Sequence, residues 1–203
     1  MSAIAARTSA HSHREMAKLM SALSLGIIAA ALLRGYIGGP DPATSVPAAL
    51  LFAGVLLVLV RASGWRPPRW RMRARDAALG IAGAALLLAA WLAGGERVLL
   101  DAPRHLTALA WWSPVVTLVA VSEEIALRGA LFAALLRWKG GAAAVVVTSL
   151  LFALIHVPLY GWQAVPVDAA VGVVLGGLRL LSGGVAAPAM AHALTDLAAG
   201  WLG

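Results

Sequence analysis

Apolar residues recur along the chain in long stretches that are separated by short polar segments. The stretches cover residues 19–37, 46–60, 77–95, 106–136, 142–160, 164–178 and 185–202. A helix that crosses the hydrocarbon core of a bilayer needs about 20 apolar residues, within a range of roughly 17–25. The pattern therefore predicts an all-α protein, a polytopic membrane helix bundle of about seven (six to eight) transmembrane helices.

The stretch over residues 106–136 is longer than one straight span requires. Its length of about 31 residues corresponds to roughly 46 Å of α-helix at 1.5 Å per residue. The hydrocarbon core is only about 30 Å thick. We expect either a kink at Pro114 or a short first helix that lies along the membrane interface.

Composition agrees with a membrane protein and excludes several other classes. Of the 203 residues, 61% are hydrophobic and 12% are charged, and the mean hydropathy is +0.86. A soluble domain has about 45–50% apolar and about 25% charged residues, so a soluble globule and a disordered chain are both excluded. The chain has no cysteine, which excludes disulfides, thiolate metal sites and cysteine nucleophiles.

The net charge of +7 comes mostly from arginine and predicts an orientation in the membrane. With the N-terminus inside, the external loops hold only Arg97 and Arg104, whereas twelve basic residues fall on the cytoplasmic side. These are Arg7, Arg14, Lys18, Arg61, Arg66, Arg69, Arg71, Arg73, Arg75, Arg137, Lys139 and Arg179. The bias predicts a cytoplasmic N-terminus, and we expect a multi-pass protein of a bacterial cell membrane.

The basic segment over residues 61–75 is typical of a cytoplasmic loop in such a protein. Docking of anionic lipid headgroups or of an acidic partner is the alternative. Nucleic acid is not an expected partner.

Ionisable residues within the apolar stretches are distributed unevenly between the two halves of the chain. The first three stretches hold almost none besides Arg34, which we expect to snorkel from a helix end. The last four hold Glu123, Glu124, Arg128, His156, Asp168, Arg179, His192 and Asp196. Asp168 and Arg179 lie near span ends and are expected to be loop or snorkelling residues.

A charge at the bilayer centre costs about 2.5–3.5 kcal/mol on insertion scales and usually marks function. We therefore predict a basic cytoplasmic tail over residues 1–18 and scaffold helices over residues 19–105. The catalytic helices are predicted over residues 106–203.

Two adjacent glutamates provide the first candidate site residues. Glu124 and Arg128 are four residues apart on one helix face, as an ion pair prefers. Glu123 points about 100° away and is free to face another helix. A carboxylate held away from water suits a general base.

Two further patterns place histidines on helix faces. His156 shares a face with Phe152, and Asp196 shares a face with His192. Counting 1.5 Å per residue along each helix places Glu123, both histidines and Asp196 in one layer. Such a layer has the groups that activate a water molecule and bind an oxyanion.

The motifs EExxxR, FxxxH and HxxxD, in this order, resemble those of the CPBP family of intramembrane endopeptidases. This is the CAAX protease and bacteriocin-processing family, also called Rce1-like or Abi, and the resemblance covers about residues 106–203. It implies that Glu123 activates a water and that His156 and His192 bind the oxyanion or a metal. The supporting residues that it implies are Glu124, Arg128 and Phe152.

The last position of the third motif is often Asn in the family, whereas this chain has Asp196. An ionised aspartate cannot donate a hydrogen bond. Orienting His192 is therefore the alternative to a role in oxyanion binding.

The predicted function is an intramembrane endopeptidase that hydrolyses a peptide bond of a membrane-associated protein or peptide. The resemblance implies substrates of the prenylated CAAX type or substrates with a leader. The mechanism is either purely glutamate-based or assisted by a divalent metal such as zinc, with His156, His192 and Glu123 as ligands. The alternative functions are a proton-coupled transporter or channel and a catalytically idle immunity or binding protein.

Overall fold

The computed structural model describes residues 3–41, 43–67, 72–93 and 106–202, of which residues 3–13 and 106–108 are described by their backbone. Over these ranges the chain is helical and has no β-strand, which confirms the all-α class. The elements are α1 (Ala3–Gly38), α2 (Val46–Ala62), α3 (Ala74–Ala93), α4 (Leu106–Glu124), the π-helix η1 (Ile125–Leu131), α5 (Phe132–Tyr160), the 3-10 helix η2 (Trp162–Ala164), α6 (Val165–Ser182) and α7 (Ala186–Leu202).

The helices α4, η1 and α5 follow one another without a loop, but the chain reverses within α5. Gly140 has φ 84°, in the left-handed region that glycine adopts most readily. The guanidinium carbon of Arg128 lies 4.8 Å from the ring centroid of Phe152, whereas 24 residues of straight helix would separate them by about 36 Å. The two arms on either side of Gly140 therefore run back along each other.

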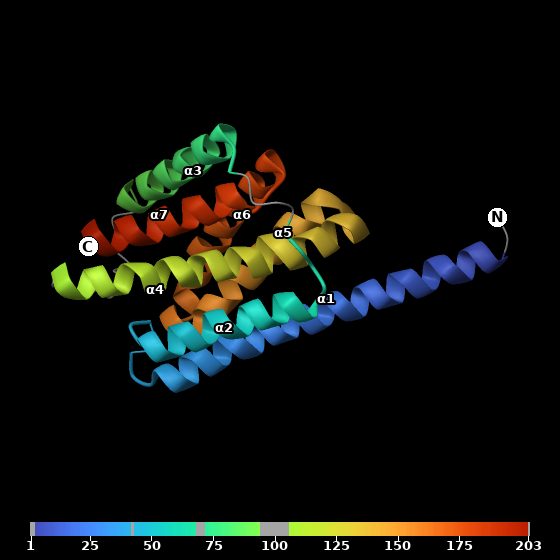
Figure 1. The fold of residues 1–203 in the computed structure, drawn as a ribbon, viewed down its shortest axis with the longest axis horizontal. Helices are drawn as coiled ribbons and strands as arrows, with labels where there is room; N and C mark the ends of the chain where they lie inside the picture. The colour runs from blue at the N-terminus through green and yellow to red at the C-terminus, as the bar shows by residue number, and fades with distance from the viewer. Residues whose placement is uncertain (1–2, 42, 68–71, 94–105, 203) are drawn as a thin grey trace.

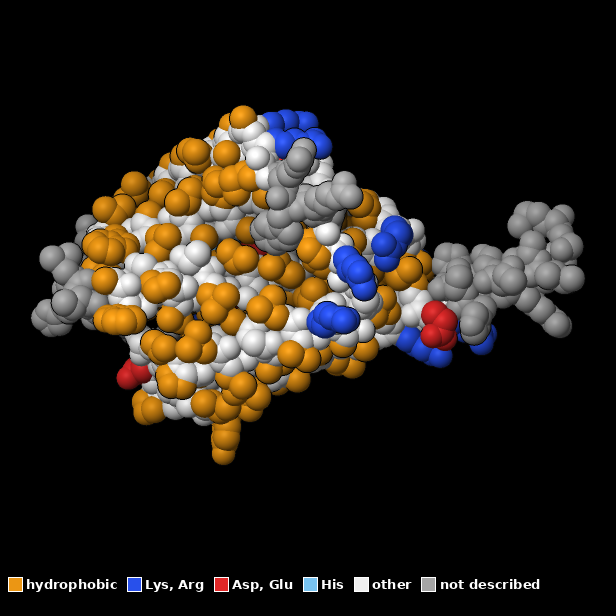
Figure 2. Space-filling view, viewed as in Figure 1, with side chains coloured by type: hydrophobic (Ala, Val, Ile, Leu, Met, Phe, Trp, Pro, Cys, Tyr) orange, Lys and Arg blue, Asp and Glu red, His pale blue; other side chains and the backbone are white. Residues whose placement is uncertain are grey.

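Within the described residues, four segments are long and apolar enough to cross a membrane. They are Arg14–Gly38, Ala74–Ala93, Leu109–Tyr160 and Trp162–Ser182, and α2 is a shorter apolar helix. Exposed apolar side chains cover much of the visible face between the two ends of the molecule (Figure 2). These features indicate an integral membrane protein, and the count of seven spans stays a prediction.

Two expectations about local structure differ from the fold. Residues 1–18 were expected to form a tail, but α1 already begins at Ala3 and continues into the first apolar stretch without a break. The stretch from residue 106 continues as a helix through Pro114. Its irregular part is instead η1, which follows directly after Glu124.

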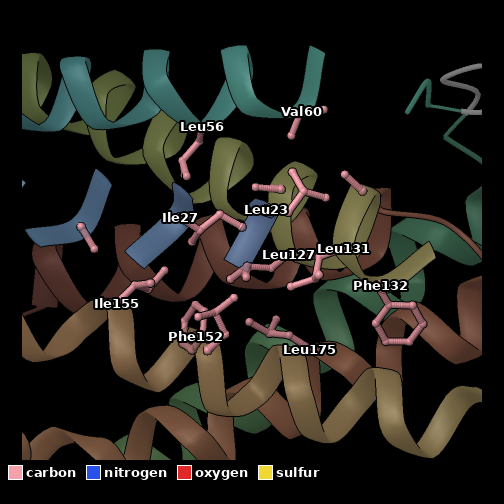
Figure 3. Packing of buried hydrophobic residues seen from close by; sticks show 14 of the residues in the cluster. Leu23, Ile27, Leu56, Val60, Leu127, Leu131, Phe132, Phe152, Ile155 and Leu175 are labelled. Atoms are coloured by element: carbon pink, nitrogen blue, oxygen red, sulfur yellow. The ribbon is translucent and has the colours of Figure 1, made fainter. Parts of the chain in front are cut away.

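In Figure 1, α4 lies between α7 and α2. Helix α4 packs against α2 and α7, whereas α1 packs against α2 and α5, and α3 covers α7 and α6. The centre is filled by large apolar side chains from α1, α2, η1, α5 and α6 (Figure 3). Examples that are fully buried are Leu56, Leu127, Leu131 and Leu175.

A glycine brings α6 close to α5. A Cβ atom on Gly172 would lie 2.7 Å from the Cα atom of Ser149, too close for any larger residue at this backbone separation. Gly176, one turn later, faces Val145, whose Cγ1 atom a Cβ would approach to 3.1 Å. Small residues at these positions permit the close helix contact that fixes the second arm of α5.

Candidate active site

The candidate site lies where α1, α4, α5 and α7 meet, and four of its ionisable groups are almost completely buried. Glu123 is 2% exposed, His192 is 4% exposed, and Glu124 and Arg128 are 0% exposed. Buried charges of this kind are stable only when they are paired or hydrogen-bonded. The contacts of each group therefore determine what it can do.

The ion pair expected between Glu124 and Arg128 is present. Nη1 of Arg128 donates to Oε1 of Glu124 at 2.7 Å, and Nη2 donates to the carbonyl oxygen of Gly172 at 3.1 Å. The same guanidinium lies over the ring of Phe152. Arg128 thus contacts α4, α6 and α5 at the same time. Glu124, Arg128 and Phe152, the predicted supporting residues, therefore connect these helices next to the site.

The π-helix η1 carries Arg128 and begins directly after Glu124. A π-helix has a wider turn than an α-helix and occurs often at functional sites. Nothing in the amino-acid pattern of residues 125–131 predicts it, because a single glycine, Gly129, among ordinary helix formers does not mark a π-helix.

His192 is oriented by the buried ion pair. Its Nδ1 lies 3.1 Å from Oε1 of Glu124, and Nδ1 donates because a carboxylate only accepts. Its Nε2 lies 3.4 Å from Oδ2 of Asp196 and 3.9 Å from Oε2 of Glu123. Glu124 therefore turns the second nitrogen of His192 toward the two other carboxylates.

His156 presents a different group to the site. Its Nδ1 lies 2.7 Å from the carbonyl oxygen of Phe152 and donates to it. In a neutral imidazole the other nitrogen is then an acceptor. His156 therefore needs a second proton to bind an oxyanion, whereas in its neutral form it accepts a hydrogen from water or an amine.

Arg34 of α1 is a site residue that the sequence analysis assigned elsewhere. We expected it to snorkel, but it is 8% exposed and its Nη1 lies 3.9 Å from Oε1 of Glu123. Its guanidinium also lies over the ring of Phe52 at 5.2 Å. The available signal was a single arginine within an apolar stretch, which by itself marks a functional residue.

A cavity of about 50 Å³ adjoins Glu123. A water molecule needs about 10–15 Å³ of such space, so the cavity has room for water beside the carboxylate. It is lined by Arg34, Ala43, Trp112, Val116, Val119, Glu123, His156, Leu159, Tyr160 and Asp196. A second cavity of about 30 Å³ shares Arg34 and Trp112 with the first and follows α2 and α4.

Arg179 and Asp168 both differ from the expected loop or snorkelling residues. Nε of Arg179 donates to the carbonyl oxygen of Arg128 at 2.8 Å, and its guanidinium lies over the ring of Phe132. Asp168 lies in the first turn of α6, where its Oδ2 is buried without a hydrogen-bond partner. Arg179 thus ties α6 to η1 beneath the site.

The metal-assisted alternative requires three ligands that converge. In the described part of the chain, no three His, Asp or Glu side chains are placed to hold a metal ion. Nδ1 of His156 and Nδ1 of His192 are both engaged by oxygen atoms, and the other nitrogen of His192 faces Asp196. The described residues therefore do not fit a metal centre.

Comparison with known protein families matches residues 105–198 to the family described as type II CAAX prenyl endopeptidase Rce1-like. The matched segment contains the three motifs on which the resemblance rests, and it confirms that resemblance. It does not contain Arg34. Searches of curated proteins and of solved structures gave no match.

Proposed function

Because residues 105–198 belong to the Rce1-like family of type II CAAX prenyl endopeptidases, we propose that the chain is an intramembrane endopeptidase whose general base is Glu123. One observation carries the proposal: the buried carboxylate of Glu123 lines a cavity with room for water. Arg34 and His192 each approach that carboxylate to 3.9 Å. Arg34 thus places a permanent positive charge near the carboxylate that would take a proton from water.

The proposed reaction begins with a water molecule in the cavity. Glu123 takes one proton from the water, and the oxygen forms a bond to the scissile carbonyl carbon while the carbonyl π electrons move onto its oxygen. When the carbon–nitrogen bond breaks, those electrons re-form the carbonyl and the departing nitrogen takes the proton from Glu123. No covalent intermediate with the enzyme is needed.

The two histidines take different parts in this scheme. His192, which Glu124 orients through Nδ1, directs Nε2 toward Glu123 and Asp196. With both ring nitrogens protonated, it donates from Nε2 and stabilises negative charge near them. Neutral His156 accepts a hydrogen from the water or from the departing amine. Asp196 acts as a positioning residue for His192, because their side chains lie 3.4 Å apart.

The proposed substrate is a membrane-associated protein or peptide, of the prenylated CAAX type or with a leader segment. The proposed location is a bacterial cell membrane with the N-terminus in the cytoplasm, on the basis of the basic segments. Hydrolysis of a peptide bond is the reaction type that the family match supports.

The test compares the termini of membrane proteins by mass spectrometry in cells that express the wild type, Glu123→Gln or Glu15→Gln at matched levels. Glu15 is an exposed glutamate whose partner is Lys18, and its change is the matched control. We expect one or a few uncleaved precursors to accumulate with Glu123→Gln alone. Identical profiles for all three strains contradict the proposal and leave the transport and binding alternatives.

A further inference from the structure

The catalytic scheme assigns no role to Tyr160, which lines the cavity beside Glu123. Tyr160 continues the helix face that carries Phe152 and His156, because the three residues follow one another at intervals of four along α5. The ring centroids of Phe152 and His156 are 4.5 Å apart. Those of His156 and Tyr160 are 5.9 Å apart, and the two rings are nearly parallel, at 12°. The ring of Tyr160 is therefore held against a histidine of the candidate site.

The backbone of Tyr160 is fixed as well. Tyr160 is the last residue of α5, and Gly161 follows it with φ 79°, in the left-handed region, which ends the helix. The backbone N–H of Gly161 donates to the carbonyl oxygen of Val157 at 2.9 Å, and the side chain of Gln163 donates to the carbonyl oxygen of Tyr160. A donor whose ring and backbone are both fixed needs no rearrangement when negative charge develops beside it.

The hydroxyl of Tyr160 is available to a ligand in the cavity. Within the described part of the chain it makes no hydrogen bond, and a phenol keeps its proton at neutral pH and can donate to an oxygen atom. The cavity of about 50 Å³ holds only a few water molecules at about 10–15 Å³ each, so the groups that line it face the same small volume. A scissile carbonyl that meets a water in this volume therefore brings its oxygen close to the hydroxyl.

The ionisable groups at the cavity leave a need for such a donor. Nδ1 of His156 donates to the carbonyl oxygen of Phe152, so the second nitrogen of the neutral ring accepts. An ionised Asp196 also only accepts, and Glu123 is the group that takes the proton from water. Arg34 supplies a permanent positive charge, which stands 3.9 Å from the carboxylate of Glu123. These groups lack a neutral donor that needs no prior protonation.

Two of the side chains that line the cavity can provide a neutral donor, the indole of Trp112 and the hydroxyl of Tyr160. The six-membered ring of Trp112 packs against Gly200 of α7, whereas Tyr160 is stacked on His156. We propose that Tyr160 is a further catalytic residue, whose hydroxyl donates a hydrogen bond to the oxyanion that forms on the scissile carbonyl oxygen. The hydroxyl keeps its proton throughout, so the transfer from water to Glu123 and on to the departing nitrogen is unchanged. This role rests on the proposed function, because it requires hydrolysis of a peptide bond.

The chain has only two tyrosines, which provides a matched control for the test. Tyr160→Phe removes the hydroxyl but keeps the stacked ring, and Tyr36→Phe makes the same change at a side chain that is 86% exposed. The full-length variants are purified in detergent, and the substrate is the precursor that accumulates with Glu123→Gln. We expect kcat of Tyr160→Phe to fall about 10²-fold with KM unchanged, as for the loss of one oxyanion donor. We expect Tyr36→Phe to match the wild type.

Tyr160→Leu separates the hydroxyl from the ring stack, because it removes both. If only the stack on His156 matters, Tyr160→Phe has the wild-type kcat and Tyr160→Leu alone is slow, a result that overturns the proposal. A rise in KM with kcat unchanged, or an equal loss in Tyr36→Phe, overturns it as well. Removal of the hydroxyl breaks no hydrogen bond within the described residues, so Tyr160→Phe should keep the melting temperature of the wild type in detergent.

Glu123→Gln distinguishes failure of this proposal from failure of the proposed function. If precursors accumulate with Glu123→Gln but Tyr160→Phe keeps the wild-type kcat, the endopeptidase stands and the role of Tyr160 is refuted. If Glu123→Gln leaves all termini unchanged, the proposed function is refuted and the role of Tyr160 is refuted with it. Accumulation with Glu123→Gln together with the loss of kcat in Tyr160→Phe supports both.

Discussion

Helix α1 and the segment matched by the family model contribute to the site in different ways. Within residues 105–198, Glu124 holds Arg128 and His192 by hydrogen bonds of 2.7 Å and 3.1 Å. Helix α1 contributes Arg34, whose Nη1 stands 3.9 Å from Glu123, which is longer than a hydrogen bond. The matched segment thus fixes geometry, whereas α1 adds a positive charge that remains available to a ligand in the cavity.

The largest expected effect on stability comes from the matched segment. Arg128→Leu leaves Glu124 buried without its cation, and removal of one partner of a buried pair typically costs about 3–5 kcal/mol. We expect a loss of that order in the free energy of unfolding, measured in detergent. Arg137→Leu, at an exposed position, is the control. A loss below about 1 kcal/mol for Arg128→Leu contradicts the structural role of the pair.

The second effect tests α1 and is expected in catalysis more than in stability. Arg34→Gln removes the permanent cation from the cavity in which negative charge develops, and loss of one such donor typically lowers kcat about 10²–10³-fold. Arg34→Lys keeps the charge and is expected to recover part of the rate. The measurement is the cleavage rate of a precursor identified with Glu123→Gln. Equal cleavage rates for Arg34→Gln and wild type would mean that α1 contributes only to the scaffold, the role predicted for residues 19–105.

A smaller effect is expected at the end of the third motif. Asp196→Asn keeps the size of the side chain but removes the charge beside Nε2 of His192. If Asp196 positions His192, the cleavage rate falls about tenfold, which corresponds to about 1.4 kcal/mol. A rate that rises with Asn instead assigns residue 196 to oxyanion binding, because an amide can donate a hydrogen bond.

The smallest effect is expected outside the site on α1. Nζ of Lys18 lies 2.8 Å from Oε1 of Glu15, and both side chains are exposed. Exposed pairs of this kind contribute about 0–1 kcal/mol. Lys18→Ala should therefore change neither the free energy of unfolding by more than that amount nor the cleavage rate. A larger effect would mean that the exposed first part of α1 takes part in folding.

The periodicity of apolar residues predicted most of the fold, because long apolar stretches have few stable alternatives to a helix in a membrane. It placed α2, α3, α6 and α7 to within a few residues. It did not place the start of α1, because a helix that leaves the bilayer continues through polar residues. The reversal in α5 depends on one glycine, Gly140, next to a second glycine, and the sequence does not say which of the two turns.

The candidate site was predictable within helices but not between them. The 100° offset correctly separated Glu123 from the pair formed by Glu124 and Arg128, because it depends only on helix geometry. Which helix faces Glu123 depends on packing between distant segments. The position of Arg34 beside it therefore became visible only in the fold.

The position of Arg34 limits how this catalytic unit can be reused. A graft of residues 105–198 onto another membrane scaffold would transfer Glu123, the proposed general base, and both histidines. It would leave behind the cation of Arg34 and the α1 surface that packs against α5. The recipient would have to present an arginine at the same depth from a helix of its own. The matched segment is therefore not a self-sufficient unit, because Arg34 of α1 lies outside it.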